Sequence, residues 1–154
     1  MDASYTSSIT EFAIVLAGFS GLVIAIGSKG GKSSPLTKHR TLCLLSFSFA
    51  AAFGSLLPAL ALSFGIPNIW IFSSYGLICI LLVAVSVVHL SARLLLNEEE
   101  RKKLAWYMYI LIYWVNAFLV FLLALMPIAG LFFIALVWQL IVSAILFTRL
   151  ILQS

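Results

Sequence analysis

Charged side chains are scarce in this chain. Only 9% of its 154 residues are Asp, Glu, Lys or Arg, whereas a soluble domain has about 25%. Apolar residues make up 64% of the chain, against roughly 45–50% in a soluble domain. This composition excludes a water-soluble globular fold, and the polar stretches are too short for a separate domain. It predicts one integral membrane domain over residues 1–154.

Acidic residues and cysteines are also few, with five Asp and Glu and two Cys. Cys43 and Cys79 fall at different depths in two apolar runs, and a disulfide needs Cα atoms within about 7 Å. We therefore expect no disulfide. The chain has no acid–His–nucleophile set and no cluster of metal ligands. We expect neither an enzyme nor a protein that holds a metal or another cofactor, and we expect no removable signal peptide.

Five apolar runs are long enough to span a membrane, because crossing about 30 Å of hydrocarbon takes roughly 20 helical residues. Ser34 and Pro35 are typical of a helix start, and Gly65 with Pro67 is typical of a helix end. The predicted fold is an all-α bundle of five transmembrane helices. The alternative has four spans, with the first or last helix lying in the interface. The predicted helices cover residues 9–27, 35–64, 69–96, 98–126 and 131–152.

The positions of the basic residues predict the orientation. Short segments rich in Lys and Arg stay in the cytoplasm. The connections after the second and fourth predicted helices carry no charge. The N-terminus is therefore expected outside and the C-terminus inside. All nine basic residues lie next to the other two connections or the C-terminus, at Lys29, Lys32, Lys38, Arg40, Arg93, Arg101, Lys102, Lys103 and Arg149.

The first group of basic residues suits anionic lipid headgroups on the cytoplasmic side, at about 1 kcal/mol for each residue near the surface. This group is Lys29, Lys32, Lys38 and Arg40. The basic residues do not form the extended patch of a nucleic-acid-binding protein. The bilayer, and not a nucleic acid, is the expected partner of this surface.

Glu11 is the only acid within reach of the hydrocarbon, and an ionisable group there is costly unless it has a function or a partner. Ser55 and Ser74 are expected at similar depth on the next two helices. Together these three residues are candidates for an outer cation site. The alternative is local, because Ser8 and Glu11 also have the spacing of a capping box at the start of the first helix.

Small residues recur along the first predicted helix. Such a pattern lets helix backbones approach closely in lipid. We expect this face to pack on the second helix or on another subunit, and a narrow pore lined by small residues is the alternative. The residues are Ala13, Ala17, Gly18, Gly21 and Ala25.

Asn116 and Gln139 lie opposite each other if the last two helices form a tight antiparallel hairpin around Pro127. Both then fall near the middle of the bilayer, where two side-chain amides can satisfy each other. They are predicted to form an interhelical polar pair. Asn116 also continues a stripe with Tyr109 and Tyr113 that should face protein or a cavity.

Two histidines lie toward the cytoplasmic side. His39 and His89 could ligate haem, relay protons or sense pH. Their depths differ by about two helical turns and no third ligand accompanies them. A hydrogen bond to a neighbouring helix or to the membrane interface is the favoured interpretation, and His89 is also a candidate for lining a pathway near a cytoplasmic gate.

Several short segments resemble those of small, uncharacterised bacterial multi-pass membrane proteins. They are Ala17-Gly18-Phe19-Ser20-Gly21-Leu22-Val23, Arg40 at the start of the second helix, Leu56-Leu57-Pro58, and Trp70 followed by Ser73-Ser74. The resemblance implies a multi-pass protein of the bacterial plasma membrane. It implies no activity.

The function predicted from these features is a homo-oligomeric membrane protein that forms an ion-conducting or small-solute pathway. The alternative is a non-conducting accessory or sensor subunit of a larger membrane complex, with a membrane protein as its partner. One feature separates them. A pathway needs its polar residues on a shared water-facing stripe, whereas packing needs them paired from helix to helix.

Overall fold

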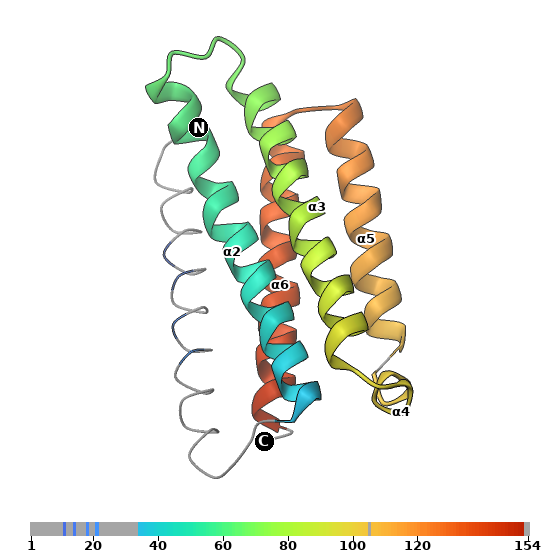
Figure 1. The fold of residues 1–154 in the computed structure, drawn as a ribbon. Helices are drawn as coiled ribbons and strands as arrows, with labels where there is room; N and C mark the ends of the chain where they lie inside the picture. Colours follow the sequence, from blue (N-terminus) through green and yellow to red (C-terminus); the bar gives the residue numbers. More distant parts are fainter. Residues whose placement is uncertain are drawn as a thin grey trace.

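The computed structural model describes residues 34–104 and 106–152, together with Glu11, Ile14, Gly18 and Gly21. The described residues form helices and no strand. Four of these helices are long and apolar enough to cross a membrane, which indicates a multi-pass membrane protein. The helices are α2 (Pro35–Ser63), α3 (Ile69–Leu95), α4 (Glu98–Lys102), α5 (Trp106–Leu125) and α6 (Ala129–Leu152) (Figure 1).

The first predicted span lies mostly outside the described residues. Its four described members, Glu11, Ile14, Gly18 and Gly21, are each helical. Gly18 and Gly21 do not mark a close approach within the chain, because a Cβ added at either would meet no atom within 4 Å. The packing expected of this face, on α2 or on another subunit, stays a prediction. Ala13, Ala17, Ala25, Lys29 and Lys32 lie outside the described residues.

The ends of α2 follow from local sequence. Ser34 caps the helix by accepting a hydrogen bond from the Thr37 backbone N–H at 3.2 Å, and Pro35 occupies the first turn. Gly65 ends it with a φ of 66°, a conformation that glycine adopts without steric cost. The predicted bounds of α2 and α3 each differ from the observed bounds by one residue at the C-terminal end.

The predicted continuous helix over 98–126 is wrong, because the chain forms α4 and α5 with a break between them. Asn97 and Glu100 make a capping box that starts α4, with the Asn97 N–H donating to Glu100 at 3.1 Å. Figure 1 shows α4 end-on and α5 from the side, so the chain changes direction. A charged segment avoids the hydrocarbon that α5 enters. The predicted start of the last helix at 131 also differs from the structure, in which α6 starts two residues earlier.

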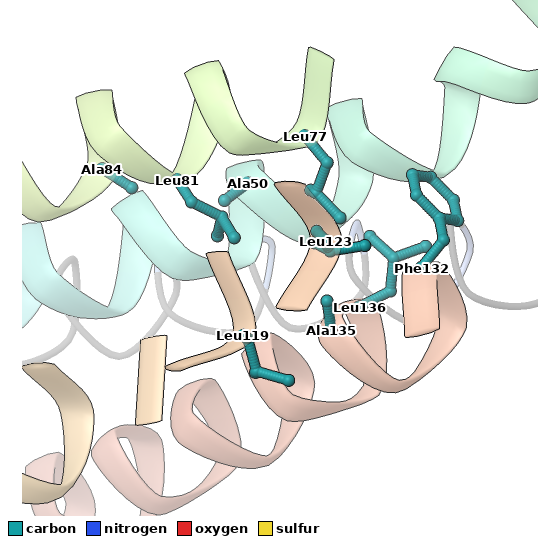
Figure 2. Close-up of a cluster of buried hydrophobic side chains, with 9 residues drawn as sticks. All are labelled: Ala50, Leu77, Leu81, Ala84, Leu119, Leu123, Phe132, Ala135 and Leu136. Atoms are coloured by element: carbon teal, nitrogen blue, oxygen red, sulfur yellow. The ribbon is translucent and has the colours of Figure 1, made fainter. Parts of the chain in front are cut away.

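The long helices pack unequally. α2 packs most extensively against α3 and then α6, whereas α5 makes much smaller contacts with α3 and α6. Gly54 lets α2 approach closely, since a Cβ there would lie 2.7 Å from Leu77 Cδ1 and 2.8 Å from Leu136 Cδ2. Figure 2 shows the main apolar cluster, to which all four long helices contribute: Ala50, Leu77, Leu81, Ala84, Leu119, Leu123, Phe132, Ala135 and Leu136.

The two ends of the bundle differ in charge. α2 starts, α3 ends, α5 starts and α6 ends at the same end of the bundle, next to α4 (Figure 1). We call it the basic end. Both connections at the opposite end, 64–68 and 126–128, are free of charge. The basic end carries every described Lys and Arg: Lys38, Arg40, Arg93, Arg101, Lys102, Lys103 and Arg149.

Candidate functional site in the bundle interior

The bundle buries polar side chains and exposes large apolar ones. Its outer surface includes exposed side chains such as Trp114, Phe118 and Leu82, as expected of helices that face lipid. In the interior, by contrast, polar groups have to find partners on neighbouring helices. The buried polar residues are His39, Ser48, Ser55, Ser73, Ser74, Ser91, Asn116, Gln139 and Ser143.

His39 forms the largest polar cluster, near the basic end. Its side chain is 0% exposed. Its Nδ1 lies 2.8 Å from Ser91 Oγ on α3, and its Nε2 is hydrogen-bonded to the Tyr109 hydroxyl on α5. Cys43 Sγ, one turn along α2, lies 3.5 Å from the same Nε2. This set of four residues, which we call the His39 cluster, therefore joins α2, α3 and α5.

The hydrogen bonds of Ser91 favour one tautomer of the neutral histidine. The Ser91 hydroxyl donates its only proton to the Val88 carbonyl at 2.8 Å. Ser91 Oγ must therefore accept at the other contact, so His39 Nδ1 carries the proton and donates. Nε2 of the neutral ring is then an acceptor for the Tyr109 O–H. A second proton on His39 would turn Nε2 into a donor, and the Tyr109 hydroxyl would have to rotate.

A small cavity of about 30 Å³ lies beside the cluster. Cys43 and Tyr109 line it, as do Arg40 from α2 and Arg149 from α6. Its volume is enough for one or two water molecules. Apart from these four residues, the described lining of the cavity is apolar.

Asn116 and Gln139 form the second polar contact of the interior. Gln139 Nε2 donates to Asn116 Oδ1 at 2.7 Å, and Asn116 Nδ2 donates to the Ile112 carbonyl at 2.8 Å. Asn116 is 2% exposed and Gln139 is 0% exposed. The structure thus brings the two amides together across the α5–α6 hairpin. Gln139 Oε1 has no hydrogen-bond partner among the described residues.

The Asn116–Gln139 contact can be measured as a coupling free energy. We expect Asn116→Leu and Gln139→Leu to show coupling of about 0.6–1.7 kcal/mol in a double-mutant cycle of unfolding in detergent micelles. Each single variant should destabilise, because it leaves the other amide without its partner. Coupling near zero would mean that the 2.7 Å contact contributes nothing to holding α5 on α6.

The other predicted site residues do not share one face. Ser55 is buried and donates to the Ala52 carbonyl at 2.7 Å. Ser74 is also buried, with no hydrogen-bond partner for its hydroxyl among the described residues. Glu11 and His89 are exposed. The two serines therefore face the bundle interior, whereas Glu11 and His89 are exposed. The outer site of Glu11 with Ser55 and Ser74 stays a prediction.

Sequence reasoning considered His39 together with His89 and missed the cluster. Lys38 is exposed and Arg40 is half-buried, in keeping with the headgroup level, but the residue between them points inward. A signal was available. His39 and Cys43 are four residues apart and share one face of α2, and Tyr109 belongs to a stripe that was expected to face protein.

Comparisons of the chain with protein-family models, curated proteins and solved structures find no match. Function must therefore be inferred from the geometry of this chain. The main observation is that two polar contacts of the interior, those of His39 and of the Asn116–Gln139 pair, run from one helix to another.

Proposed function

We propose that this chain is a non-conducting sensor or accessory subunit of a larger membrane complex. In this proposal α5 moves relative to the other helices, and the hydrogen bonds of the His39 cluster hold α5 against α2 and α3. One observation carries the proposal. The hydrogen bonds of His39 with Ser91 and Tyr109, and of Gln139 with Asn116, pair helix to helix. Pairing of this kind favours packing over a shared water-facing stripe.

α5 is the helix best suited to move. It has the smallest packing contacts of the four long helices. Two buried or part-buried polar contacts, through Tyr109 and Asn116, join it to the rest of the bundle. Two exposed contacts add to them, from Arg149 to Tyr107 and from Tyr75 to the Ala124 carbonyl. An apolar groove of about 650 Å³ runs between α3 and α5, with Leu82 on one side and Trp114 and Phe121 on the other. Lipid-facing space along α5 lets it shift without unpacking α2, α3 and α6.

The His39 cluster provides a stimulus for that movement. A proton on His39 reverses the hydrogen bond with Tyr109, because Nε2 becomes a donor and the hydroxyl must rotate to accept. It also places a positive charge close to Arg40 on α2 and to the cavity that Arg149 lines from α6. The other two residues around the ring, Ser91 and Cys43, are neutral and do not compensate this positive charge. Acid should therefore weaken the contact between α2 and α5.

Pulsed EPR can test this movement. Spin labels at the exposed positions Leu94 on α3 and Ile110 on α5, in a Cys43→Ala, Cys79→Ala background, report the separation of the two helices. We expect the distance distribution to broaden as the pH is lowered from about 7.5 to about 4.5, a range that extends well below the ordinary pKa of histidine.

Two variants serve as comparison and control for this measurement. His39→Gln should abolish the pH response, because glutamine can hydrogen-bond but does not titrate. His89→Gln changes an exposed histidine and should respond like the parent protein. If the distance distribution of the parent protein does not change with pH, the sensor mechanism is ruled out.

A homo-oligomeric pathway for ions or small solutes is the second candidate. Several buried polar atoms have no hydrogen-bond partner among the described residues, including the Ser48, Ser73 and Ser143 hydroxyls and Gln139 Oε1. Such atoms could exchange protons or hold water within the bundle. Flux of protons or K⁺ into liposomes that contain the purified protein would favour this candidate, with Glu11→Gln as the first variant. Absence of flux favours the sensor.

The proposed setting is the bacterial plasma membrane, with the basic end in the cytoplasm and residues 9–27 as a fifth span that places the N-terminus outside. The confinement of the described Lys and Arg residues to one end supports this orientation. Labelling of an Asn68→Cys variant by an impermeant thiol reagent from outside intact cells tests it. We also propose that the chain assembles in this membrane, either with further copies of itself or with another membrane protein.

A further inference from the structure

Two arginines that are distant in sequence converge on one cavity. Arg40 in the second turn of α2 and Arg149 in the last turn of α6 both line the space of about 30 Å³ beside Cys43 and Tyr109. The two side chains are half-buried, and their charges are close enough to interact. No carboxylate is among the described residues that line the cavity. The described lining of the cavity thus includes two arginines and no acidic residue.

Arg149 is held in position by Tyr107 on α5. Its Nη2 donates to the Tyr107 hydroxyl at 2.8 Å, and its guanidinium carbon lies 5.6 Å from the centre of the Tyr107 ring. A guanidinium has five N–H donors, so this contact leaves donors for a ligand. Fixing the side chain in advance lowers the entropy cost of binding.

The rest of the lining selects an amphiphilic ligand. Phe47, Leu104 and Leu146 line the same cavity, so apolar side chains adjoin the two arginines. The site lies at the basic end of the bundle, where α2 begins and α6 ends (Figure 1). Ends of membrane-spanning helices lie at the headgroup level of a bilayer. The ligand therefore has an anionic head and an apolar body.

We propose that Arg40 and Arg149 form a binding site for a phosphate oxyanion, supplied by the headgroup of an anionic phospholipid. Guanidinium groups bind phosphate oxygens through paired, charge-assisted hydrogen bonds. One phosphate oxygen enters the cavity, and the acyl chains lie along the apolar surface outside it. Free inorganic phosphate offers the same oxygens without the acyl chains. The site is independent of any pH response of His39.

Native mass spectrometry of delipidated protein in detergent tests the site. Phosphatidylglycerol, phosphatidylcholine and inorganic phosphate are titrated separately into the parent protein, an Arg40→Gln, Arg149→Gln variant and a Lys102→Gln control. Lys102 is an exposed cation of the basic end that does not line the cavity. We expect the parent to prefer phosphatidylglycerol, and each lost arginine to weaken its binding about tenfold. Lys102→Gln should bind like the parent.

A second variant guards against misfolding. Arg40→Lys, Arg149→Lys keeps both charges but loses the planar fork, and we expect it to bind phosphatidylglycerol more weakly than the parent. Arginine-dependent binding of inorganic phosphate with equal strength would support the oxyanion site but identify free phosphate as its source. Equal losses in the arginine variants and in Lys102→Gln, or no preference for phosphatidylglycerol over phosphatidylcholine, would overturn the proposal.

Discussion

His39→Leu should lower the free energy of unfolding by about 2 kcal/mol, because it leaves the part-buried Tyr109 hydroxyl without its acceptor and takes a partner from Ser91. The leucine fits the buried volume without restoring any hydrogen bond. The expected loss should appear in reversible unfolding of the protein in mixed micelles. Because α5 has few other contacts, protease cleavage in the connection between α4 and α5 should also become faster.

His89→Leu is the matched control for that experiment. It makes the same chemical change one helix away at an exposed position, and we expect a change within about 0.5 kcal/mol. Tyr109→Phe removes the other partner of the His39–Tyr109 hydrogen bond. It should reproduce part of the loss in the free energy of unfolding that we expect for His39→Leu. Equal effects of His39→Leu and His89→Leu would show that the cluster does not hold α5 in place.

Gly54→Leu should be the most destabilising single substitution considered, at about 3 kcal/mol, because it overfills a tightly packed interface. Even a Cβ at this position would lie 2.7 Å from Leu77 and 2.8 Å from Leu136. A leucine would push α2 away from both α3 and α6, which are its main packing partners. Gly54→Ala should cost less, since both neighbouring atoms are ends of flexible side chains.

Gly130→Leu provides the control for overpacking. Gly130 is exposed near the start of α6, and a Cβ there would meet no atom within 4 Å. Helix propensity favours leucine over glycine by roughly 0.5–1 kcal/mol, so this variant should be neutral or slightly stabilised. A Gly54→Leu protein that unfolds at the same denaturant concentration as Gly130→Leu would mean that α2 does not pack as closely as described.

Features that depend on one helix or one short turn could be predicted from the sequence. Hydrophobic length and the capping residues Ser34 and Pro35 fix where α2 begins, and Gly65 fixes where it ends. The contact of Asn116 with Gln139 follows from a tight antiparallel turn, which sets the register of α5 against α6. The break after α4 was missed because a charged run and an apolar run can belong to one helix by periodicity alone.

The sequence by itself determined that the chain is an apolar, all-helical membrane protein with a basic end and an uncharged end. Only the tertiary structure decided which side of each helix faces inward. Lipid and protein interior are both apolar, so the sequence carries little contrast between the two faces of a helix. Close packing at Gly54 fixes the rotation of α2. This rotation turns His39 toward Ser91 and Tyr109, buries Ser55, and brings Arg40 to the cavity it shares with Arg149.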